Sequence, residues 1–346
     1  MIRGELSVRG TATRIEGPLL SLERNVVVDL GDAVEVVGED GSARLGRVSA
    51  LDDARMVVEV LESTSGLSLQ GTRLRLRGEP LSFAVGPGLL GRVLDGVGRP
   101  IDGGPPLPAR RAMRVDGLPI NPASRVKPHE LVETGFTALD LLNSVVRGQK
   151  LPLFSEGGLP HDRMVAEIAR GARLRGASAG GFAVVFVGIG ISHDTAESFR
   201  SAMETSGALE HTVMFLNLAS ESSAQRLLAP RFALTAAEYL AFVEGRHVLV
   251  VMTDMTNYCE ALREVSASHG EIPSRKGYPG YMYSDLASLY ERAGILAGRP
   301  GSLTQLAVLT VPGGDMSHPI ADLTGYITRA RSSSTARSIA WVCTRP

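Results

Sequence analysis

Short apolar runs alternate with amphipathic stretches over residues 134–326, and this rhythm restricts the possible folds more than any other feature of the sequence. The runs are AVVFVGI from Ala183, VMFLNL from Val213, HVLVVMTD from His247 and QLAVLTV from Gln305, and the helical stretches begin near Asp194, Ser223, Thr256 and Ser284. Strands and helices that alternate along a chain form parallel sheets covered on both faces. We therefore predict an α/β domain.

The first helical stretch has a clear apolar stripe formed by Ala196, Phe199 and Met203. At its start, Asp194 and Glu197 have the spacing of a capping pair. Open parallel sheets bind ligands beyond the carboxyl ends of their strands. Any ligand site is therefore expected at that edge.

The sequence divides into four segments. Residues 1–77 contain short runs such as RNVVVDL and RMVVEVL between turn residues, which predicts a small antiparallel β-barrel. Residues 78–133 include GPGLLGRVLDGVGRPIDGGPPLP, whose glycines and prolines predict a crossing between domains. Residues 134–328 hold the mostly parallel sheet domain, and residues 329–346 form a tail of different character.

Composition excludes several classes of protein. With 36 Lys and Arg against 37 Asp and Glu, the chain has no basic field for nucleic acid. Its apolar runs are shorter than the roughly 20 residues of a membrane-spanning helix. The start, MIRGELSVRG, does not resemble a signal peptide, and 2 cysteines cannot form a disulfide framework. We expect a protein of a reducing, cytoplasmic compartment.

Asp254 ends the buried run HVLVVMTD, and two interpretations of it are open. Many nucleotide-binding sheets place a carboxylate at this point, near a metal-bound water. Aspartate is also a preferred cap for a helix that would begin near Thr256. The pattern is short and common, so the sequence does not decide between the two.

A phosphate loop of the form GxxxxGK[ST] is absent from the sequence. The nearest string is FSEGGLPHDRM, which lies between the apolar run KLPLF and a helical stretch. If Gly158, which follows Gly157, takes the place of the last glycine of a phosphate loop, Leu159 stands in the position of the lysine and Pro160 in that of the hydroxyl. The missing charge and metal ligand are each worth several kcal/mol. The loop is therefore predicted to be degenerate for nucleotide binding.

Other candidate groups give weaker signals. The histidines show no metal-ligand spacing, so no metal site is predicted, and Cys259 suits a buried helix position. The segment SRKGYPGYMYSDL carries Tyr278, Tyr281 and Tyr283 among glycines, prolines and cations. Such aromatic loops often form contact surfaces, but a local aromatic core is an equally good interpretation.

The sheet part of the chain contains several long and distinctive strings. They are VVRGQKLPLFSEGGLPHDRM, FRSAMETSGALEHTVMFLNLA, RFALTAAEYLAF, HVLVVMTDMTNYCEALREVSA, GYPGYMYSDLASLYERAG and HPIADLTGYIT. In this order they closely resemble the non-catalytic B subunit of rotary V-type and archaeal-type ATPases and ATP synthases. The resemblance extends from the N-terminal barrel to about Thr328.

This resemblance implies a RecA-like nucleotide-binding fold and a ring in which three such chains alternate with three catalytic A subunits. It also implies central-stalk and peripheral-stalk partners on the cytoplasmic side of a membrane, without direct insertion into it. The complex would translocate protons or sodium ions. No cofactor is expected to bind tightly, with ATP or ADP at most a weak ligand at subunit interfaces.

The resemblance also identifies positions at which this chain lacks a catalytic residue of the A subunit. A glutamate activates water in the catalytic subunit, and the matching position here is Ile191 in GIGISHD. Together with the loop, this implies a chain that regulates catalysis at its interfaces and is not catalytic alone.

The tail departs from the family. Members of the family continue past GYIT into a helical domain through a string close to PSLSRLM, whose arginine reaches a neighbouring catalytic site. Here Thr328 is followed by RARSSSTARSIAWVCTRP, and no residue inherits that role. A neighbouring frame of residues 331–346, back-translated with GC-rich codons, can spell AIVLDRALDRVGVYPP, which resembles the family's continuation. We therefore expect a frameshift in the gene or its sequencing, and no C-terminal helical domain.

Three functions remain open on the sequence. The leading one is a structural and regulatory subunit of an ion-translocating rotary ATPase. The second is a free-standing P-loop-type ATPase, which would require the lysine that this loop lacks. The third is a frameshifted remnant with no function.

Overall fold

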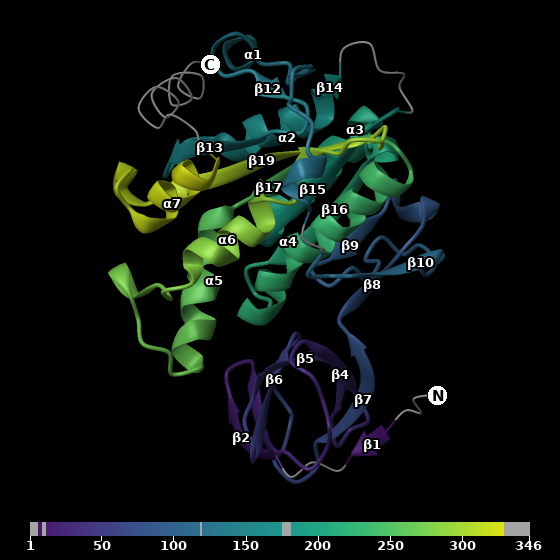
Figure 1. The fold of residues 1–346 in the computed structure, drawn as a ribbon, viewed down its shortest axis with the longest axis vertical. Helices are drawn as coiled ribbons and strands as arrows, with labels where there is room; N and C mark the ends of the chain where they lie inside the picture. Colours follow the sequence, from purple (N-terminus) through teal and green to yellow (C-terminus); the bar gives the residue numbers. More distant parts are fainter. Residues whose placement is uncertain (1–5, 9–11, 118–119, 175–180, 329–346) are drawn as a thin grey trace.

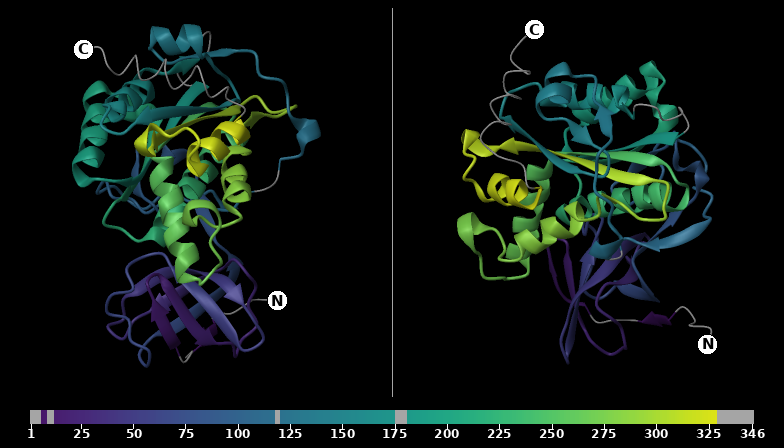
Figure 2. Two further views of the ribbon diagram at one scale, coloured as in Figure 1. Left: turned by 90° about the vertical axis from the view of Figure 1, so that its left-hand side faces the viewer. Right: turned by 45° about the horizontal axis from the view of Figure 1, so that its top comes forward.

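The structure, a computed structural model, describes residues 6–8, 12–117, 120–174 and 181–328 (Figure 1). A curled antiparallel sheet lies at the N-terminal end, and a larger α/β part lies against it (Figure 2). The expectations for the frameshifted tail, residues 329–346, lie outside the described residues.

The N-terminal sheet links its strands in the order β1-β7-β4-β5-β6-β3-β2, and each neighbouring pair is antiparallel. The strands are β1 (Leu6–Val8), β2 (Ala12–Glu16), β3 (Leu19–Glu23), β4 (Asp32–Val37), β5 (Ala43–Leu51), β6 (Arg55–Val60) and β7 (Arg73–Pro80). In β7 the leucines are buried and the alternate arginines exposed, because successive side chains of a strand point to opposite faces. The predicted small antiparallel β-barrel is confirmed.

Residues 78–133 contain short strands that the sequence did not indicate. Strand β8 (Ser82–Val85) pairs with β10 (Arg111–Arg114) in a separate antiparallel ribbon. Strand β9 (Val93–Asp95) pairs in parallel with β16 of the large sheet. The 3-10 turns η1 (Pro87–Leu89) and η2 (Pro122–Ser124) lie in the same segment. The segment therefore crosses between the two parts and also completes the larger one.

The large sheet has the order β13-β19-β17-β15-β16-β9, and these neighbours are parallel. Its strands are β13 (Lys150–Glu156), β15 (Phe182–Ile191), β16 (Thr212–Leu218), β17 (His247–Thr253) and β19 (Ser302–Val311), with β18 (Gly294–Ile295) antiparallel to β19. A small side sheet joins β11 (Leu131–Glu133), β12 (Val145–Val146) and β14 (Arg173–Leu174). The four apolar runs were thus correctly predicted as strands of a parallel sheet.

Helices cover both faces of this sheet. They are α1 (Thr137–Leu142), α2 (His161–Gly171), α3 (His193–Ser206), α4 (Ser223–Glu238), α5 (Met255–Ser268), α6 (Met282–Tyr290) and α7 (Pro319–Thr328). Short turns join them: η4 (Ala208–His211), the π-helical η5 (Tyr239–Val243), η6 (Arg275–Gly277) and η7 (Pro312–Gly314). Helices α3, α4, α5 and α6 begin within two residues of the predicted starts.

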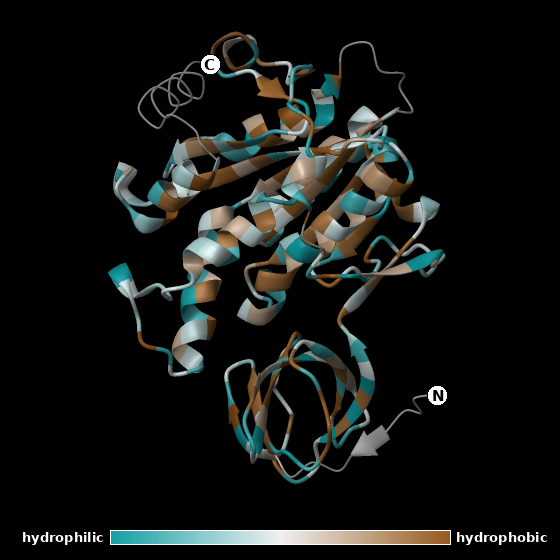
Figure 3. Ribbon diagram, in the orientation of Figure 1, coloured by the Kyte–Doolittle hydropathy of each residue, from teal (hydrophilic) through white to brown (hydrophobic). Residues whose placement is uncertain are grey.

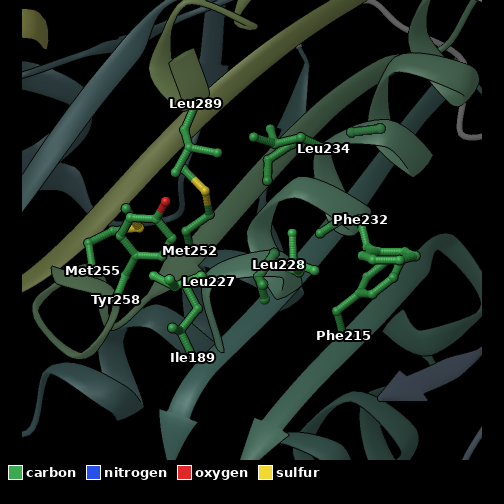
Figure 4. Packing of buried hydrophobic residues seen from close by; sticks show 14 of the residues in the cluster. Ile189, Phe215, Leu227, Leu228, Phe232, Leu234, Met252, Met255, Tyr258 and Leu289 are labelled. Carbon is green, nitrogen blue, oxygen red and sulfur yellow. The ribbon is translucent and has the colours of Figure 1, made fainter. Parts of the chain in front are cut away.

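Alternation along the strands divides the apolar core between the two faces. Val184 and Phe186 of β15 pack in one cluster with side chains of α2 and α3, whereas Val185 and Val187 pack in the other with α4, α5 and α6. The second cluster includes Phe215, Phe232 and Met252 (Figure 4). In Figure 3 the strands of the sheet are mostly hydrophobic, as a sheet buried on both faces requires.

The cap of α3 differs from the prediction. Its N-cap is Ser192, whose side chain accepts a hydrogen bond from the Thr195 amide, and Asp194 lies inside the first turn. The proposed capping pair of Asp194 and Glu197 is therefore wrong. Serine two positions earlier satisfies the free amide, and the Asp194 carboxylate remains favourable near the positive end of the helix dipole.

Among the described residues, no helix combines the length and the apolar character that crossing a bilayer would require.

Candidate functional site

The degenerate loop joins a strand to a helix at the carboxyl edge of the sheet. Strand β13 ends at Glu156, residues 157–160 form the loop, and α2 begins at His161. Gly158 adopts a φ of +86°, a conformation open mainly to glycine. The backbone thus makes the strand–loop–helix turn of a phosphate site.

The side chains of this loop do not supply the chemistry of a phosphate site. Leu159 is half-buried, and Pro160 is the N-cap of α2 without a side-chain hydrogen bond. The amide of His161 donates to the Leu159 carbonyl at 2.8 Å, so it is occupied within the turn. Since proline has no amide proton, the start of α2 offers fewer donors to an anion than a phosphate loop does.

Asp254 follows β17, and β19 separates that strand from β13. Its Oδ1 accepts the Thr256 amide at 2.8 Å, and its Oδ2 accepts the Thr310 amide at 3.1 Å. It is 8% exposed and is the N-cap of α5. The carboxylate therefore acts as a cap, the second of the two interpretations left open, and it also bridges to β19.

Asp162, in the first turn of α2, is a charged neighbour that the sequence reasoning did not identify. Burial raises the pKa of its carboxyl, and the Asp254 carboxylate raises it further, while His161 lowers it. His161 Nε2 lies 3.5 Å from Asp162 Oδ1. The Asp254 carboxylate thus acts on the Asp162 carboxyl beside the loop. The order of the predicted strands suggests that Asp162 and Asp254 lie at the same edge of the sheet. The sequence does not show that one carboxylate changes the pKa of the other residue.

Ile191 is the last residue of β15 and is 6% exposed. It belongs to the apolar cluster that includes Phe199 and Leu216. Its side chain contains no group that accepts a proton, so it cannot act as a general base there. The described residues also hold no group of three or more His, Cys, Asp or Glu side chains that could bind a metal ion.

The three tyrosines of the aromatic segment have different environments. Tyr278 is 4% exposed, and its hydroxyl donates to Glu260. Tyr281 and Tyr283 are each 43% exposed, and the Tyr283 ring centroid lies 6.0 Å from that of Tyr326 on α7. Tyr278 therefore belongs to a local core, whereas the other two form surface.

The loop that carries Tyr278 is held against the segment before α7. The Tyr278 ring meets that of His318 edge-on, with centroids 5.8 Å apart. Arg275 donates to the Ser317 carbonyl, and Lys276 pairs with Asp315 at 3.1 Å. His318 is 9% exposed, and its Nδ1 has no hydrogen-bond partner among the described residues.

The burial of His318 predicts that the free energy of unfolding falls in acid. Burial lowers the pKa of His318, and Lys276 lowers it further, although Asp315 and Glu260 oppose the change. The neutral form of His318 therefore stabilises the folded state. This contribution to the free energy of unfolding is fully present above the ordinary pKa of about 6.5, and it is lost as pH falls through the lower pKa of the folded state. Such a group contributes about 1.4 kcal/mol to the free energy of unfolding for each unit by which its pKa in the folded state lies below its pKa in the unfolded state.

Urea unfolding at neutral and acidic pH measures this effect. We expect His318→Gln to lose less free energy of unfolding on acidification than the parent chain does. The control is His193→Gln, at an exposed position, which should follow the parent. Equal acid sensitivity of the His318→Gln variant and the parent would contradict the prediction.

A polar network at the ends of β15 and β16 was also missed. Asn217 accepts the Gly190 amide at 3.1 Å and donates to Gln225 at 3.0 Å. Asn257 donates to the carbonyls of Ile189 and Gly190. Amide side chains carry no charge signal in a sequence, so only the fold shows that they gather at this edge.

Comparison with known proteins gives a consistent result. The sequence profile of the nucleotide-binding domain of the ATP synthase alpha/beta family matches residues 135–337. The V-type ATP synthase beta chain of Halothermothrix orenii is 52% identical over 323 residues, which are 93% of this chain and 69% of that protein. The B subunit of the A-type ATP synthase of Staphylothermus marinus is 51% identical over 318 residues, covering 92% of this chain and 68% of that protein. The V-type ATP synthase beta chain 2 of Treponema pallidum is 50% identical, and 66% of its length is covered.

Proposed function

Because this chain belongs to the ATP synthase alpha/beta family, with B-type subunits of ATP synthases among its relatives, we propose that it is the non-catalytic B subunit of an ion-translocating V-type complex. Its place as a subunit of an ATP synthase complex follows from these relatives. The proposal adds that it regulates and supports catalysis carried out by catalytic A subunits, with which it alternates in the headpiece.

The observation that carries the proposal is the loop at residues 157–160. It keeps the strand–loop–helix backbone but has Leu159 and Pro160 where a phosphate site needs a cation and a hydroxyl. A lysine and a metal ion supply most of the charge stabilisation in phosphoryl transfer. A loop without either supports a structural role for this nucleotide-type fold.

The carboxylates near the loop support the same conclusion. Burial raises the pKa of the Asp162 carboxyl and the Asp254 carboxylate raises it further, so a phosphate placed there would add negative charge beside two carboxyl groups. Asp254 also uses both of its oxygens as acceptors for backbone amides. We infer that any ATP or ADP binds weakly and between subunits.

The proposed partners are A-type subunits, with central-stalk and peripheral-stalk subunits around them, on the cytoplasmic side of the membrane. Tyr281 and Tyr283 are the candidate contact residues, because both are partly exposed aromatic side chains on one segment. Tyr278 is buried and positions that segment.

Co-expression with a catalytic A-type subunit of a V-type ATP synthase tests the proposal. We expect the two chains to copurify as a complex, and we expect this complex to weaken when the tyrosine surface is disrupted. The variant for that purpose is Tyr283→Glu, which places a charge on the proposed surface. Its matched control is Leu141→Glu on α1, where the parent side chain is 75% exposed.

The outcomes separate the alternatives. A stable complex that Tyr283→Glu weakens and Leu141→Glu leaves intact supports the proposed role and its surface. Failure of the parent chain to bind the A-type subunit, although both chains are folded, would favour a remnant. ATP turnover by the B-type chain alone would favour a free-standing ATPase.

A further inference from the structure

A hollow of about 490 Å³ lies between strand β10 and the end of helix α4. Its apolar lining includes Met113 on β10, Phe242 and Val243 on η5, and Leu296. Val243 is 46% exposed, so this lining is open to a partner. The π-helical turn η5 forms one wall, and such turns often occur at functional sites.

This hollow is distinct from the degenerate loop. Val243 and Arg299 come shortly before the first residues of β17 and β19, His247 and Ser302. Residues 157–160 follow the last residue of β13. Because these strands are parallel, the hollow lies at the amino edge of the sheet and the loop at the carboxyl edge.

The charge around the hollow is positive. Arg111, Arg114 and Arg299 all line it, and the first two side chains have no hydrogen-bond or ion-pair partner among the described residues. Arg299 donates to the Phe242 carbonyl and keeps its charge. Glu238 is the acidic residue in the lining, but Arg292 neutralises it through two hydrogen bonds of 2.6 and 2.8 Å.

Strand β10 also offers backbone groups, apart from the Arg114 carbonyl, which accepts from the Gly117 amide at 3.2 Å. It lines the hollow along its four residues, Arg111–Arg114, and within the described residues it pairs with β8 alone. One edge of the strand is therefore without a neighbouring strand. Such an edge can accept an extended segment through main-chain hydrogen bonds.

From these observations we propose that the hollow beside β10 is a docking site for an extended acidic segment of another protein chain. The segment adds to the free edge of β10, places an apolar side chain against Phe242 and Val243, and sets carboxylates near Arg111 and Arg114. Charge complementarity selects this occupant, because three arginines surround an apolar floor whose one carboxylate is already paired. The site is not part of the proposed nucleotide chemistry and stands without it.

A short peptide probes this chemistry directly. The probe is a fluorescein-labelled hexapeptide with a Val-Phe centre and two acidic residues on each side, and its binding to the full chain is followed by fluorescence anisotropy. We expect measurable binding that weakens as salt rises, because screening reduces the attraction between exposed charges. The double variant Arg111→Glu with Arg114→Glu should weaken binding at least tenfold.

Matched controls isolate the site. The double variant Arg73→Glu with Arg77→Glu makes the same charge change at exposed positions of the barrel strand β7 and should bind like the parent. Val243→Asp should also weaken binding, whereas a peptide with lysines in place of the acidic residues should not bind. Thermal melts of each variant verify that it is folded.

Several results would overturn the proposal. Absence of peptide binding, or equal binding by both arginine double variants, would show that the hollow is not a docking site for an acidic segment. Displacement of the peptide by a fatty acid at lower concentration would assign the hollow to a small amphipathic anion. Concentration-dependent dimerisation that the Arg111 and Arg114 changes abolish would assign it to a second copy of the chain.

Discussion

Replacement of Arg292 by alanine is expected to lower the free energy of unfolding by about 3 to 5 kcal/mol, because it would leave a buried carboxylate without its partner. Arg292 is 4% exposed and Glu238 is 7% exposed. The guanidinium also donates to the Thr235 hydroxyl at 3.0 Å and to the Val115 carbonyl at 3.1 Å. Each of these acceptors would lose a donor in the interior, which adds to the cost.

Urea denaturation followed by circular dichroism measures this change. The control is Arg200→Ala, which removes the exposed pairs with Glu197 and Glu204 and should cost about 0 to 1 kcal/mol. Replacing Arg292 by Met and Glu238 by Leu together removes both charges, so this double variant should be less destabilised than Arg292→Ala. Equal losses for Arg292→Ala and Arg200→Ala would contradict the assignment.

The purified chain is expected to hydrolyse ATP no faster than the background reaction. Enzymes typically accelerate their reactions by at least about 10⁶-fold, so a catalytic chain would be unmistakable in the assay. Leu159 and Pro160 supply neither a cation nor a metal ligand, and Ile191 offers no base. A coupled assay for released phosphate, on protein freed of contaminating ATPases, measures the rate.

Two variants make this result decisive. Asp254→Asn keeps an N-cap residue and should leave the background rate unchanged. Combining Leu159→Lys with Pro160→Thr restores the residue types of a phosphate loop, yet turnover should remain absent because the base is still missing. Turnover in the parent that disappears in Asp254→Asn would instead make this chain an ATPase.

The larger elements could be predicted because their patterns are long. The runs that became β15, β16, β17 and β19 are mostly apolar, as expected for strands buried on both faces. Strand β9 has three residues among glycines and prolines, which is too short for any periodicity to show. The N-cap of α3 could not be predicted for a different reason. Ser192 and Asp194 are both residue types that cap helices, and the sequence does not decide between them.

The candidate site was predictable in its composition but not in its contacts. The absent lysine could be read directly at Leu159, whereas the effect of Asp254 on Asp162 depends on two elements distant in sequence. The aromatic segment shows why. Tyr278 and Tyr281 are the same residue type three positions apart, and the packing of His318 and Glu260 around Tyr278 distinguishes them.

The pairing of β9 with β16 affects how the chain can assemble during synthesis. A ribosome makes residues 93–95 long before residues 212–218, so β9 has no partner strand until β16 has been made. A fragment that began at residue 134 would have the opposite defect. It would contain β16 without β9, and the exposed strand edge would favour association between copies.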